Sequence, residues 1–171
     1  MKFIKHLPII MLVLCSHQAF AGANELKNQT MPCAVLTNGK VVSKNSKCVV
    51  DITETANMHG ASQDWTFRAN KNYQKTEIIK ATSFLTDKNG DDLLDETGEP
   101  QTNNVVLLNG QDADFNLRMP NTFKILTTKQ TKQYYEGKLK NTKGEKIKPY
   151  QCYHQIGNPK FEFCFIDGRY N

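Results

Sequence analysis

Residues 150–166 read YQCYHQIGNPKFEFCFI, and this stretch decides the fold class. A turn signal at 157–159, Gly-Asn-Pro, lies midway between Cys152 and Cys164. A β-hairpin centred on this turn places the two cysteines opposite each other, where a disulfide can join them.

The same hairpin register assigns the remaining side chains to two faces. It predicts a cross-strand pair between His154 and Glu162 on the cysteine face, so His154 is interpreted as structural. Aromatic side chains occupy the other face, which is typical of a half-buried strand. These are Tyr153, Phe161, Phe163 and Phe165.

A second cysteine pair, Cys33 and Cys48, also flanks a turn signal, here at 38–40. Four cysteines remain once an N-terminal leader is set aside, and an even number in an exported chain indicates disulfides. We therefore expect the bonds Cys33–Cys48 and Cys152–Cys164. A metal site or a redox pair is disfavoured because the chain has no C-x-x-C spacing.

Strand-like runs rich in β-branched and aromatic residues recur between the two hairpins, separated by Asn-Gly and Lys-Gly turns. They lie at 47–53, 64–69, 102–108, 114–119 and 122–128. The fold is therefore expected to be mainly β, a small antiparallel sandwich or barrel with two disulfide-stapled hairpins. Residues 73–85 fit a strand and a helix about equally well, and 129–140 could form one short helix ending near Gly137.

The N-terminus has the pattern of a secretory signal peptide over residues 1–21. Lys2 and Lys5 precede an apolar run, and small residues at 19 and 21 mark the cleavage site. No apolar run approaches the roughly 20 residues of a membrane span. We expect an exported chain, periplasmic or extracellular, with a flexible segment at 22–31 and a single β-rich domain at 32–171.

Six acidic side chains surround Lys88 in the stretch TDKNGDDLLDETGE at 86–99. The spacing of Asp87, Asn89 and Asp91 fits the first three ligands of an EF-hand loop, but the required Gly and Glu at positions 6 and 12 are missing. A different calcium loop could use these three residues together with Asp92 and Asp95. Contact with a partner and a solvated turn are the alternatives. No other cofactor is predicted.

The opposite charge gathers at 118–148, where nine Lys and Arg face two Glu. Arginine is absent from 119 to 168, whereas recognition of nucleic acid generally uses arginine. We expect no nucleic-acid partner. A solvated hairpin is favoured here, with binding of a polyanion or an acidic protein as the alternative.

Catalytic candidates are few in residues 22–171. His59 and Asp64 supply residue types of an acyl-transfer site, but no G-x-S-x-G nucleophile elbow accompanies them. No catalytic residue is assigned, and an enzyme is the less favoured interpretation. The leading hypothesis is an exported β domain that binds a protein in the envelope or the extracellular space, as an inhibitor or immunity-type protein does. A secreted effector or hydrolase and a calcium-dependent adhesion module are the alternatives.

Overall fold

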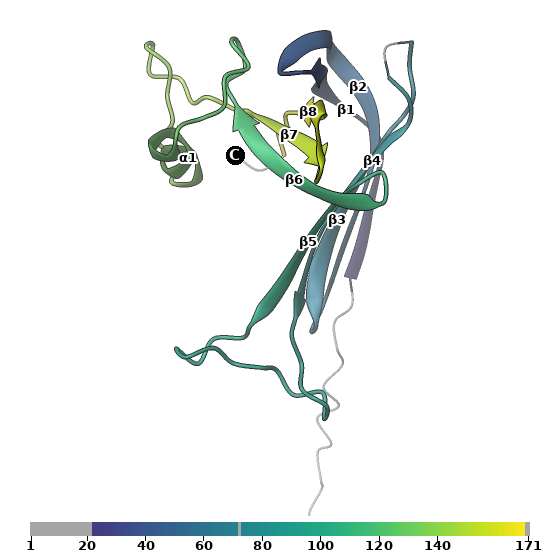
Figure 1. The fold of residues 1–171 in the computed structure, drawn as a ribbon, viewed down its shortest axis with the longest axis vertical. Coiled ribbons are helices and arrows are strands. Elements are labelled where there is room, and N and C mark those ends of the chain that lie inside the picture. The colour runs from purple at the N-terminus through teal and green to yellow at the C-terminus, as the bar shows by residue number, and fades with distance from the viewer. Residues whose placement is uncertain (1–21, 72, 170–171) are drawn as a thin grey trace, which may run out of the picture.

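In the part of the chain that the structure describes, eight antiparallel strands follow one another in a single sheet, and the last strand pairs with the first to close a barrel (Figure 1). The computed structural model describes residues 22–71 and 73–169. The strands are β1 (Gly22–Thr37), β2 (Lys40–Asn57), β3 (Gly60–Phe67), β4 (Thr76–Phe84), β5 (Thr102–Leu108), β6 (Gln111–Arg118), β7 (Tyr150–Gln155) and β8 (Asn158–Phe165). The predicted mainly β fold is confirmed, in its barrel form. The predicted signal peptide lies outside the described residues.

The structure corrects the expectation for one segment and decides between two alternatives for another. Residues 22–31, expected to be flexible, form the first part of β1 and pair with β2. Their side chains are mostly exposed, so main-chain hydrogen bonds rather than a buried stripe hold them in the sheet. The ambiguous segment at 73–85 contains the strand β4, which forms antiparallel main-chain hydrogen bonds with β3 on one side and β5 on the other.

The sheet closes into a barrel over only part of the length of its strands, because the strands differ in length. β6 pairs with β5 only at Leu107 and Leu108 and then turns toward β7. β8 reaches β1 only at Cys33–Thr37. The other halves of β1 to β5 continue beyond the closed body as an open sheet, which points downward in Figure 1.

Aromatic side chains fill the closed body. The rings of Trp65, Phe67, Tyr153, Phe163 and Phe165 are at most 2% exposed and pack at centroid distances of 4.8–5.7 Å. Tilted and offset pairs of this kind stabilise a core beyond the area that they bury. The alternating aromatic face predicted for β8 therefore lies inside the barrel.

Both predicted disulfides are present. Cys152 and Cys164 stand directly opposite each other in the β7–β8 hairpin, with their Cα atoms 3.9 Å apart. Cys33 and Cys48 join β1 to β2 across a Cα separation of 5.9 Å, next to a bulge that shifts the register between Met31 and Cys33. Each bond ties a hairpin together on the closed body.

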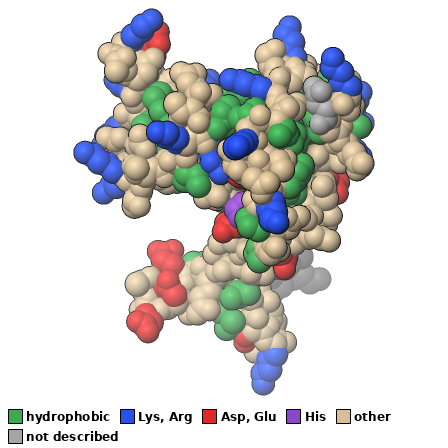
Figure 2. Space-filling model, turned by 45° about the horizontal axis from the view of Figure 1, so that its top comes forward, with side chains coloured by type: hydrophobic (Ala, Val, Ile, Leu, Met, Phe, Trp, Pro, Cys, Tyr) green, Lys and Arg blue, Asp and Glu red, His purple; other side chains and the backbone are tan. Residues whose placement is uncertain are grey.

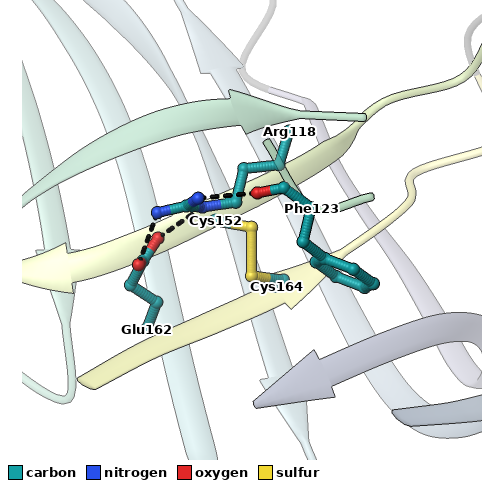
Figure 3. Close-up of a disulfide and its surroundings, with 5 residues drawn as sticks. All are labelled: Arg118, Phe123, Cys152, Glu162 and Cys164. Carbon is teal, nitrogen blue, oxygen red and sulfur yellow. Dashed lines mark hydrogen bonds and ion pairs between the residues drawn. A yellow bond between two sulfur atoms is a disulfide. The ribbon is translucent and has the colours of Figure 1, made fainter. Parts of the chain in front are cut away.

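The predicted pair between His154 and Glu162 is wrong. A register shift between Tyr153 and Gln155 leaves His154 without an opposite residue on β8, and its opposite residue is Asp114 of β6 on the other side. Glu162 instead accepts two hydrogen bonds from the Arg118 guanidinium, at 2.9 and 2.7 Å (Figure 3). The buried carboxylate of Glu162 is held by the charged guanidinium of Arg118 instead.

Arg118 also donates to the carbonyl of Phe123 at 2.7 Å, which pins the turn after β6 over the Cys152–Cys164 bond (Figure 3). Phe123 then stacks on Tyr150 at 4.8 Å in a second apolar cluster outside the barrel. The buried pair thus attaches the segment that follows β6 to the body.

One short helix, α1 (Thr128–Tyr135), confirms the helix expected in this region. Thr127 and Gln130 form a reciprocal capping box at its start. Gly137, with φ of +67°, follows its end. Within the described residues, no helix has the length and apolar character needed to cross a membrane.

Candidate functional site

The acidic stretch projects from the open end of the sheet. Residues 85–101, here called the acidic arm, connect β4 to β5 at the far end from α1 (Figure 1). Figure 2 shows acidic side chains on this projection, whereas most Lys and Arg side chains of that face cover the closed body. The arm therefore presents negative charge on a lobe of its own.

Two turns of the same construction give the arm its shape. The Asp87 carboxylate accepts hydrogen bonds from the main-chain N–H groups of Asn89 and Asp91, at 2.7 and 3.1 Å. Eight residues later, Asp95 accepts from the N–H groups of Thr97 and Glu99, at 2.8 and 3.1 Å. In each turn the side chain of the first residue organises the main chain that follows it.

A third copy of this turn lies in the hairpin after α1. There the Asn141 side-chain oxygen accepts from the N–H groups of Lys143 and Glu145, at 2.8 and 3.0 Å. The shared pattern is Asp or Asn, two variable residues, Gly, then Asp or Glu, and the Gly has a positive φ in all three turns. Sequence reasoning missed this repeat, although aligning 87–91, 95–99 and 141–145 reveals it.

The turns already engage two of the carboxylates predicted to bind calcium, those of Asp87 and Asp95. Hydrogen bonds from the turn hold the pKa values of Asp87 and Asp95 below their usual range. The Asn89 side chain donates its amide to Asp87 at 3.1 Å instead of offering its oxygen outward. The calcium site predicted here stays a prediction, and Asp91 and Asp92 are its least engaged candidates.

Potential metal ligands converge elsewhere in the part of the chain that the structure describes. One group of three, Cys152, Glu162 and Cys164, has its ligand atoms within 4.8 Å of one another. Its two sulfurs form a disulfide and its carboxylate binds Arg118. This cluster is a structural element and does not hold free ligand atoms.

The arm also exposes apolar side chains among its charges. Leu85, Leu93 and Leu94 are 38%, 40% and 56% exposed. The main chains of Leu85 and Leu93 are linked, since the Leu93 N–H donates to the Leu85 carbonyl at 2.8 Å. Exposed leucines within a charged rim have the composition of a protein–protein contact surface.

The two residues proposed as a polar site lie apart. His59 is exposed in the β2–β3 turn, and Asp64 lies on β3 opposite Ile79 of β4. Five residues of extended strand separate them by roughly 16 Å. Burial, reinforced by the nearby Glu77, raises the pKa of Asp64, while a hydrogen bond from Ser62 opposes the rise. No shared site results.

A shallow trough of about 660 Å³ lies on the open sheet, with small side chains of β1 to β4 along its walls. Lys80 lies along it with its ammonium 4.6 Å from the centre of the Phe115 ring, a cation–π contact. Burial lowers the pKa of Lys80, and the charge of Asp167 opposes this. Sequence reasoning missed Lys80, because its inward direction depends on β4 being a strand.

The basic stretch forms α1 and the hairpin after it. Lys140 and Lys146 stand opposite each other in that hairpin, where two like charges repel. Together with Lys148 they line a pocket of about 490 Å³ beside the turn at 119–121. The molecule thus has a basic end and an acidic end, as its sequence predicted.

No protein-family model, curated protein or solved structure matches the chain.

Proposed function

We propose that this chain is an exported, disulfide-stapled binding protein that contacts a macromolecular partner through its acidic arm. The observation that carries the proposal is the arm itself. It extends from the body, displays six acidic side chains and three exposed leucines, and is ordered by its own hydrogen bonds.

Order in the arm supports binding because a preformed surface loses less conformational entropy when a partner docks. Asp87 and Asp95 hold the turns, so the remaining acidic side chains are presented outward. Negative charge at the rim then speeds the approach of a basic partner, and the leucines supply apolar area at the centre of the contact.

Export is supported by the two disulfides and by the signal-peptide pattern at residues 1–21. Disulfides persist in oxidising compartments such as the periplasm and the extracellular space. An inhibitor or immunity-type protein of the envelope fits this combination of a stapled body and a charged contact surface. A hydrolase that uses His59 and Asp64 is not proposed, because these two side chains lie apart.

The test is a charge reversal that leaves the turns intact. The double variant Asp91→Lys/Asp92→Lys changes two arm carboxylates that hold no turn. Its matched control, Glu25→Lys/Asp112→Lys, makes the same change in net charge outside the arm. Both are compared with the wild-type protein for association with the partner captured from envelope and culture-medium fractions.

We expect the association rate of the arm variant to fall at least about tenfold and to depend less on salt concentration. The association rate of the control should stay near that of the wild type. Equal association of all three proteins would remove the arm from the interface and overturn the proposal.

A further inference from the structure

Directly after the acidic arm, β5 has an open edge. Its residues from Thr102 to Val105 pair with β4 on one side, but β6 pairs only with Leu107 and Leu108 on the other. Figure 1 shows β6 curving away from β5 at this point. Main-chain groups along this edge therefore face outward, and no strand of the described residues lies beside them.

The alternation of an antiparallel ladder identifies these groups. The N–H of Asn109 donates to Glu77 of β4, so odd-numbered residues of β5 direct their main chain toward β4. The carbonyl of Leu108 accepts from the Gln155 side chain of β7, so even-numbered residues face the opposite way. Asn104 lies at the centre of the outward-facing set.

The open sheet has a second edge, on β1, and that edge is protected. β1 pairs with β8 only from Cys33 onward, so among the described strands only β2 lies beside Gly22–Gln29. Glu25 and Lys27 place an ion pair on this segment, and a bulge at Asn28, with φ of +56°, interrupts the strand. Charges and bulges are the usual devices that prevent an edge from pairing with another chain.

None of these devices occurs on β5. Residues 101–111 read QTNNVVLLNGQ and contain no charge and no proline, in a protein where 23% of residues are charged. β5 pairs with β4 without a register shift. An unprotected, regular edge is a template for the addition of a strand.

We propose that the β5 edge binds an extended segment of the partner protein, which adds to the sheet as an antiparallel strand. The segment fits if about five of its residues are uncharged, to match Thr102–Val106, and if Lys or Arg residues follow them. An antiparallel strand runs toward the acidic arm, so its C-terminal basic residues meet the arm carboxylates. This inference rests on the proposed function and adds the chemistry of the partner.

A synthetic peptide tests the edge without the natural partner. The probe TVTVTKKK supplies an uncharged β-branched strand followed by lysines, and TVPVTKKK, which cannot continue a ladder, is its control. Asn104→Pro removes an outward N–H of the edge. Thr82→Val is the control variant, because it deletes the 2.7 Å bond between Thr82 and the Asn104 side chain but leaves the main chain of the edge unchanged.

We expect the wild-type protein and Thr82→Val to bind TVTVTKKK equally, and to bind TVPVTKKK at least about tenfold more weakly. Asn104→Pro should lose about tenfold in affinity for TVTVTKKK, the equivalent of one or two hydrogen bonds. Unchanged affinity in a folded Asn104→Pro protein would overturn the inference.

Hydrogen exchange on the wild-type protein decides the question even if the proline variant fails to fold. The Asn104 amide should exchange quickly in the free protein and slow down on addition of TVTVTKKK, whereas the Asn103 amide, directed toward β4, should be slow throughout. An Asn104 amide unaffected by the peptide would refute strand addition.

The two proposals fail in different ways. If the natural partner is lost by Asp91→Lys/Asp92→Lys but kept by a folded Asn104→Pro protein, the edge is overturned and the arm stands. If both variants keep the natural partner, the proposed function is overturned as well.

Discussion

Removal of the Glu162 carboxylate should destabilise the protein far more than removal of any surface charge. Glu162 and Arg118 are 4% and 10% exposed in their side chains and share two hydrogen bonds. Glu162→Ala leaves the guanidinium buried with only the Phe123 carbonyl as acceptor. Breaking a buried ion pair in this way costs about 3–5 kcal/mol, because one charge remains without compensation.

Denaturant unfolding of the wild type, the single variants Glu162→Ala and Arg118→Met, and the double variant Arg118→Met/Glu162→Leu measures this cost. We expect Glu162→Ala to lower the free energy of unfolding by about 3–5 kcal/mol, or roughly 6–20 °C in Tm for a chain of this size. The double variant should lose less than Glu162→Ala alone, because no buried charge remains.

The exposed pair between Lys132 of α1 and Glu136, the residue after its end, provides the comparison. Glu136→Ala should cost less than about 1 kcal/mol. The reasoning would be refuted if Glu162→Ala cost as little as Glu136→Ala, or if the double variant lost as much as the two single variants together.

Two further predictions concern acidic groups. Because burial raises the pKa of Asp64, the folded state favours its protonated form. The stability that the protonated form contributes is full below the ordinary pKa of 3.8 and is lost as the pH rises through the raised pKa. Asp64→Asn should therefore melt at a higher temperature than the wild type near pH 7, and the difference should vanish below pH 3.8; a variant that melts lower near pH 7 would contradict this. Since the turns already engage Asp87 and Asp95, calcium should leave the melting temperature close to its value in chelator, and a rise with calcium but not magnesium would instead identify the arm as a cation site.

The hairpins were predictable because their signals are local. In the last hairpin, turn residues, two cysteines and alternating phenylalanines all point to the same register within 17 residues. The pairing of Cys33 with Cys48 followed from the same logic, although the sequence around Cys33 did not predict the bulge beside it. Local agreement of several signals is what makes a segment predictable.

Features that depend on distant residues were not predictable. Glu162 lies 44 residues from Arg118, so the local neighbour His154 was the only visible candidate for its partner. Residues 22–31 carry no apolar alternation, and only the adjacent β2 makes them a strand. The open edge of β5 exists because β6 turns toward β7, a consequence of barrel closure that no single segment records.

The acidic composition of the candidate site was visible in the sequence, but the hydrogen-bonded turns that shape the arm were not. The charges of 86–99 supported a calcium loop and a contact surface to a similar degree. The hydrogen bonds of Asp87 and Asp95 distinguish the residues that hold the turns from those that face outward. Mutations can therefore be directed to Asp91 and Asp92, whose loss does not dismantle the arm.

Site-specific photo-crosslinking in cells that express the protein tests the central claim most directly. A photoreactive residue replaces Leu94, 56% exposed on the arm, and, in a control protein, Val42, 62% exposed on the β1–β2 hairpin. Binding through the arm predicts a discrete covalent adduct from position 94 that is absent from position 42 and is lost with Asp91→Lys/Asp92→Lys. No adduct at position 94, or the same adducts from both positions, would contradict it.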